Sequence, residues 1–193
     1  YGGGDWSVRT RSLVGFDQGN VAGVFGGCHG ASSFYRYAGE TSQVNLYSPA
    51  DKEAMDIYGA GAYSGSENAV VNLYSGKAHN VYGASLNEGQ TDNATVNVSA
   101  GSDVTVNAIF GGGKGETADK PCDVALATVN YLSTDAHVIE SIYGGNHDYR
   151  LTVDSEVNIT VPVRNREGNL IDVYGAGYGE HTVAQNTHVN LQD

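Results

Sequence analysis

The chain has 193 residues, of which 40% are hydrophobic, and a formal net charge of −12. This length is typical of one domain, and 22 Asp and Glu against 10 Lys and Arg disfavour nucleic acid as a partner. No stretch approaches the roughly 20 apolar residues of a membrane-spanning helix, so we expect no membrane insertion.

A cluster of an aliphatic residue, an aromatic residue and a glycine recurs along the chain. Its glycine falls at positions 2, 26, 59, 83, 111, 144 and 175, in steps of 24 to 33 residues. A period of this kind is the signature of a solenoid or repeat array. The six complete copies are Val24-Phe25-Gly26, Ile57-Tyr58-Gly59, Val81-Tyr82-Gly83, Ile109-Phe110-Gly111, Ile142-Tyr143-Gly144 and Val173-Tyr174-Gly175.

A second motif lies between these markers, with asparagine between two apolar residues. Both motifs follow one another in the same order in every unit, which makes the repeat far more specific than one recurring dipeptide. The copies of the second motif are Val44-Asn45-Leu46, Val71-Asn72-Leu73, Val96-Asn97-Val98, Val129-Asn130-Tyr131, Val157-Asn158-Ile159 and Val189-Asn190-Leu191.

Each unit has the pattern of short strands joined by tight turns. Residues 156–161 alternate between polar and apolar types, as a half-buried strand does, and no run has apolar helical spacing over three turns. A step of 24 residues is too short for a propeller blade of about 40–50 residues. We therefore predict an all-β, single-domain parallel β-helix of about six to seven coils over residues 1–193, with insertions at residues 28–41, 115–127 and 164–169.

The aromatic residues of the first motif form a column in such a coil. The column is interpreted either as a buried structural stack or as a platform on which sugar rings stack. Phenylalanine at two of the six positions favours packing, because a hydroxyl group is dispensable there. The aromatic column comprises Phe25, Tyr58, Tyr82, Phe110, Tyr143 and Tyr174.

The asparagine residues of the second motif form another column. Apolar neighbours on both sides place each asparagine opposite to the core, where stacked amides can hydrogen-bond along the solenoid axis. A structural ladder is the interpretation we favour, and contact with a partner is the alternative. The ladder comprises Asn45, Asn72, Asn97, Asn130, Asn158 and Asn190.

Motifs for catalysis or for cofactors are weak in this sequence. The six histidines make no His-x-x-x-His pair, so we predict no metal site and no cofactor. The stretch Asn146-His147-Asp148-Tyr149-Arg150 groups a base, a carboxylate and a guanidinium, with a polar turn as the simpler interpretation. We assign no catalytic residue. Whether Cys28 and Cys122 form a disulfide is open, with two unpaired residues favoured.

The chain opens and closes inside repeat units, and neither end has an obvious cap. We interpret it as a segment of a longer repeat protein. Because an uncapped terminal coil exposes core and strand edge, we also expect end-to-end self-association.

The alternation of Ile/Val-Tyr-Gly-Gly/Ala with Val-Asn-Leu/Ile resembles the right-handed β-helical repeats of large bacterial surface proteins of the adhesin and autotransporter types. The resemblance covers essentially the whole chain. It implies an extracellular or cell-surface location, a non-catalytic role in adhesion, display or stalk structure, and a glycan or host surface protein as partner. A β-helical carbohydrate-active enzyme and a self-assembling fibre subunit are the alternatives.

Overall fold

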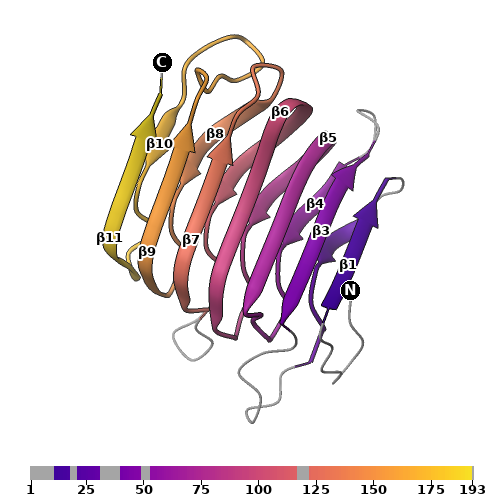
Figure 1. The fold of residues 1–193 in the computed structure, drawn as a ribbon, viewed down its shortest axis with the longest axis vertical. Coiled ribbons are helices and arrows are strands. Elements are labelled where there is room, and N and C mark those ends of the chain that lie inside the picture. The colour runs from indigo at the N-terminus through magenta and orange to yellow at the C-terminus, as the bar shows by residue number, and fades with distance from the viewer. Residues whose placement is uncertain (1–10, 18–20, 31–39, 49–52, 117–121, 193) are drawn as a thin grey trace.

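The computed structural model describes residues 11–17, 21–30, 40–48, 53–116 and 122–192. These residues form a single-domain parallel β-solenoid of about five turns, and none of them lies in a helix (Figure 1). The predicted all-β solenoid is confirmed, with fewer turns than the six to seven expected. The marker at residues 1–4 lies outside the described residues, and the last strand starts a turn whose second strand is not among them.

Every complete turn contributes to two parallel ladders, which we name face A and face B (Figure 1). The long strands β5 (Asn68–Tyr82) and β6 (Thr91–Phe110) bend from one face to the other. Face A further comprises β1 (Arg11–Phe16), β3 (Thr41–Tyr47), β7 (Val124–Tyr131), β9 (Arg150–Ile159) and β11 (Thr182–Leu191). Face B further comprises β2 (Val21–Phe25), β4 (Glu53–Tyr58), β8 (His137–Tyr143) and β10 (Asp172–Tyr174).

The main core fills the space between the two faces. On face A, strict alternation sends Val44 and Leu46 inward and Asn45 outward, as the period of two requires. On face B the alternation breaks in each long strand, because Val106 and Ile109 both enter the core. Two consecutive residues of β6, Asn107 and Ala108, therefore lie outside the main core, which resolves a frame that the sequence alone leaves ambiguous.

A glycine-rich connection leads from the end of face B back to face A and forms a third hydrogen-bonded side. The amide of Leu86 donates to the carbonyl of Gly61 at 3.2 Å, and the amide of Lys114 donates to Ser85 at 3.0 Å. Successive connections therefore stack on one another like the strands. The ladder joins residues 26–30, 59–63, 83–87, 111–115, 144–148 and 175–179.

The glycine that follows each of the first five aromatic residues of the column is required by the close approach of successive turns. A Cβ built on Gly59 would lie less than 3.0 Å from the carbonyl oxygen of Gly83, and one on Gly83 equally close to that of Gly111. These glycines do not have positive φ, so the requirement is space between turns and not a left-handed conformation.

The insertion at residues 164–169 forms a hairpin on the outside of face B. Arg164 and Leu170 pair in an antiparallel bridge, and the Arg164 guanidinium donates to the Gly168 carbonyl at 2.6 Å. The amide of Val138 donates to the Arg164 carbonyl at 3.1 Å, which places the hairpin beside β8. Of the other two predicted insertions, residues 31–39 and 117–121 lie outside the described residues. The predicted boundary at residue 127 is wrong, because residues 124–127 already belong to β7 and pair in register with β6.

We expect the substitution Gly83→Ala to destabilise the solenoid by about 3 kcal/mol, because the added methyl group overlaps the backbone of the next turn. Gly15→Ala is the matched control, since a Cβ on Gly15 meets no atom within 4 Å. Urea unfolding followed by circular dichroism measures both variants. Equal stability of the two would contradict the steric account.

Candidate functional site

The asparagine column forms one continuous ladder on the outer side of face A. In each step the amide nitrogen of one turn donates to the amide oxygen of the preceding turn. Asn72 donates to Asn45 at 2.8 Å, Asn97 to Asn72 at 2.9 Å, and Asn130 to Asn97 at 2.8 Å. The ladder continues from Asn158 to Asn130 at 2.9 Å and from Asn190 to Asn158 at 2.8 Å. The structure thus brings all six predicted residues together.

Other polar side chains extend the ladder at its two ends. The Gln43 amide donates to the oxygen of Asn45 at 2.9 Å, and Asn190 donates also to the Glu156 carboxylate at 3.3 Å. Within each step one N–H and one oxygen lone pair are engaged by the neighbouring amides. Neighbouring amides therefore occupy half of the hydrogen-bonding groups that each asparagine could offer to a ligand.

The six aromatic side chains form a second continuous column on the outer side of face B. Neighbouring ring centroids lie 4.7 to 5.1 Å apart, and the rings are within 10° of parallel. This spacing follows the repeat of stacked strands and suits offset-stacked rings.

Burial separates the two interpretations of this aromatic column. Phe25, Tyr58, Tyr82 and Phe110 are at most 8% exposed, whereas Tyr174 is 45% exposed. Burial raises the pKa of the Tyr58 and Tyr82 hydroxyl groups above the ordinary value, so both groups stay neutral. A buried ring cannot receive a sugar, and the structural stack is thus favoured over most of the column.

The glycine-rich connections cover the aromatic column. Leu86 and Tyr63 pack against it, and the His147 imidazole meets the Phe110 ring edge-on with centroids 4.9 Å apart. The rings thus belong to a second hydrophobic core outside face B. The sequence carries no signal for this cover, because the connections that form it lie outside the two motifs.

In the stretch from Asn146 to Arg150, the Asn146 side chain has a structural role and His147 lies beside Asp148. The Asn146 side chain is buried; it accepts from the Gly113 amide at 2.8 Å and donates to the Cys122 carbonyl at 3.2 Å. His147 Nδ1 lies 3.1 Å from the Asp148 carboxylate without the alignment of a hydrogen bond. Burial lowers the pKa of His147, and the Asp148 charge opposes this shift.

The two cysteines are separate and unpaired. Cys28 and Cys122 are both buried free thiols. Burial raises the pKa of the Cys122 thiol, which keeps it in the unreactive protonated form. The structure thus agrees with the favoured interpretation of two unpaired residues.

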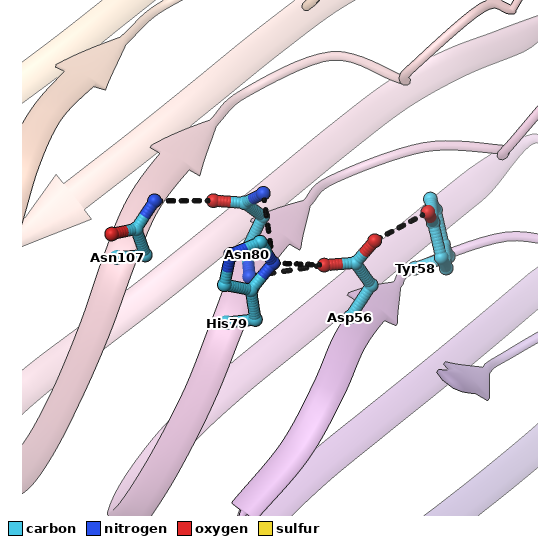
Figure 2. A network of polar contacts seen from close by, with 5 residues as sticks. All are labelled: Asp56, Tyr58, His79, Asn80 and Asn107. Carbon is cyan, nitrogen blue, oxygen red and sulfur yellow. Dashed lines mark hydrogen bonds and ion pairs between the residues drawn. The ribbon is translucent and has the colours of Figure 1, made fainter. Parts of the chain in front are cut away.

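A row of polar side chains crosses β4, β5 and β6 on the outer side of face B, as Figure 2 shows. Asp56 accepts from the Tyr58 hydroxyl at 3.1 Å and from the Asn80 backbone amide at 3.2 Å. Its carboxylate also lies 3.1 Å from Nδ1 of His79. The Asn107 amide donates to the Asn80 side chain at 3.2 Å. The row fixes the orientation of His79, whose side chain is half exposed.

A cavity of about 310 Å³, which we name the face-B groove, opens beside this row. The Arg166 guanidinium of the inserted hairpin forms one wall and donates to the Thr105 hydroxyl from Nε at 3.0 Å and from Nη2 at 2.8 Å. The hairpin therefore reaches back over β8 to β6. The groove is lined by Lys77, Ala78, His79, Thr105, Asn107, Ile139 and Arg166.

A smaller cavity of about 140 Å³ lies toward the glycine-rich connections. The Glu140 carboxylate and the His147 imidazole are its ionisable groups, and Tyr143 and Tyr178 supply aromatic surface. Asn80 lines this cavity and also belongs to the polar row beside the groove. The outer side of face B thus holds both cavities.

The sequence analysis did not identify the groove residues. The repeat register does place Lys77 beside Thr105, and Thr105 beside His137, so alignment of the motifs carries a signal for that part. It carries none for Arg166, because the path of an inserted hairpin is not set by the repeat.

No protein-family model, curated protein sequence or solved structure matches the chain. Within the described ranges, we find no helix with the length and apolar character needed to cross a membrane. No three or more His, Cys, Asp or Glu side chains of the described part are grouped to hold a metal ion.

We expect Asn97→Ala to destabilise the chain by about 1 to 2 kcal/mol, since it leaves the Asn72 oxygen and the Asn130 amide without partners. Asn190→Ala, at the exposed end of the ladder, is the control and changes stability by about 0.5 kcal/mol or less. Urea unfolding compares the variants. The ladder is not structural if both substitutions have the same effect.

Lowering the pH below about 6.5 is expected to destabilise the protein through His147. Because burial lowers its pKa in the folded state, the unfolded chain binds more protons, and stability falls as pH drops from 6.5 toward the lowered pKa. His147→Phe keeps the ring contact and removes this titration. Free energies of unfolding at pH 7.5 and 5.5 should therefore differ less for the variant. An identical pH dependence for both proteins would refute the assignment.

Proposed function

We propose that the chain is a non-catalytic β-solenoid module of an extracellular or cell-surface protein that serves adhesion or display. The observation that carries the proposal is the unbroken coupling of the turns by two different columns. Five amide hydrogen bonds run along face A and five ring contacts run along face B. Such a scaffold presents outward side chains at fixed spacing, as a display surface requires.

The position of the irregular segment supports this role. The hairpin at residues 164–169 lies outside both columns and contributes Arg166 to the wall of the face-B groove. Binding residues are often carried by loops on a rigid scaffold. The likeness of the two motifs to bacterial surface repeats agrees with an adhesive module.

Self-association is a second candidate, favoured by the last strand. In the described residues β11 is hydrogen-bonded only to β9, and Val183, Val189 and Leu191 are 57%, 40% and 74% exposed. An edge strand with exposed apolar side chains is a surface on which a further coil or a second copy can stack. This would extend the rod without altering its outer faces.

A binding screen with the purified chain tests the proposed function. We expect retention of the chain on at least one glycan or host matrix protein at millimolar concentration or below, with no oligosaccharide released from the bound polysaccharides. Sedimentation at the same concentrations measures self-association of the chain through β11, so that self-association is not mistaken for retention on a ligand. Release of oligosaccharides would show an enzyme instead, and the lack of any retention would reduce the module to a spacer.

A further inference from the structure

The face-B groove concentrates positive charge in an acidic protein. The whole chain has 10 Lys and Arg against 22 Asp and Glu, yet Lys77 and Arg166 both line this one cavity. No acidic side chain is among its described lining residues, and no described carboxylate forms an ion pair with Lys77 or Arg166. Two cations beside one cavity, neither of them ion-paired with a described carboxylate, favour an anionic ligand.

Arg166 is held in position before any ligand arrives. Its Nε and Nη2 atoms donate to the buried Thr105 hydroxyl, and the Asn165 and Arg164 side chains brace the hairpin that carries it. Nη1 of Arg166 has no hydrogen-bond partner among the described residues. A guanidinium fixed in this way loses little side-chain entropy on binding a carboxylate or a sulfate.

The remaining lining combines amide, imidazole and apolar surface. The polar row orients His79 and Asn107 through Asp56 and Asn80 (Figure 2). Ile139 is 52% exposed at the same cavity. This set matches a sugar ring, whose C–H face packs on an aliphatic side chain while its hydroxyl groups bond to the amide and the imidazole. We propose that the face-B groove binds one anionic sugar unit, bearing a carboxylate or a sulfate ester, of an acidic polysaccharide.

The geometry of the sheet favours a sugar over an acidic peptide. An extended peptide typically pairs with the free edge of a sheet. The groove lies over the interior of face B, where β5 already pairs with β4 and β6, and β6 with β8. Only side chains are offered to a ligand there. The volume of about 310 Å³ is at the lower end of the range for small-molecule sites, as a site for one sugar unit requires.

This inference rests on the proposed function, since the groove binds the sugar without cleaving it. Isothermal titration calorimetry of the full chain uses four probes: an oligogalacturonate, a sulfated oligosaccharide, a neutral oligosaccharide of equal length and a polyglutamate peptide. We expect at least one acidic sugar to bind about tenfold or more tightly than the neutral one. The first two probes distinguish a carboxylate ligand from a sulfate ligand.

Substitutions locate the binding. Arg166→Gln and Lys77→Gln should each weaken binding of the acidic sugar about tenfold. Lys114→Gln removes the same charge from outside the groove and should leave the affinity within about twofold. Thermal unfolding shows that each variant is folded. Double substitution of Lys77 and Arg166 keeps the test decisive if one cation compensates for the other.

The outcomes separate this inference from the proposed function. Equal binding of neutral and acidic sugars, tighter binding of polyglutamate, or equal losses in the Lys114 and Arg166 variants would overturn the anionic-sugar site. Adhesion through another surface would still stand in those cases. Cleavage of the oligogalacturonate would contradict the non-catalytic role itself.

Discussion

The close approach of successive turns at the glycine column is the constraint on which the rest of the structure depends. Gly59, Gly83 and Gly111 lie so near the carbonyl of the following turn that any side chain would overlap it. With the turns at strand spacing, about 4.8 Å, the residues of the two motifs meet their own equivalents in the next turn. The parallel rings and the amide ladder are consequences of that register.

Contact between equivalent residues selects which side chains can form a column. An amide carries both a donor and an acceptor and so bonds to a copy of itself, as Asn72 and Asn97 do. Aromatic rings likewise gain from a parallel neighbour. A column of like charges would repel itself at this spacing. The uniform columns of this acidic chain are accordingly neutral, and charged residues lie in columns of mixed composition such as that of Glu156, paired in register with Thr128 and His188.

The sequence predicts the fold because every unit carries the same two motifs in the same order. Two motifs in fixed order are enough to place the strands, the asparagine ladder and the ring column. Three features depend on irregular segments and are not predictable in this way. The extra outward residue between Val106 and Ile109, the cover of His147 over the rings, and the reach of Arg166 to Thr105 each involve a local bend, connection or insertion. Their positions are decided by packing between segments of unequal length.

The same distinction indicates where specific chemistry resides. A column of identical residues gives every turn the same surface, so it distinguishes no position along the rod. The register column through the face-B groove instead runs from Lys77 to Thr105 and His137, with three different residue types. The inserted hairpin adds Arg166 at that level alone. Because recognition of one ligand needs a unique set of groups, the break in the repeat, and not the repeat itself, is the reason for proposing the ligand site at the groove.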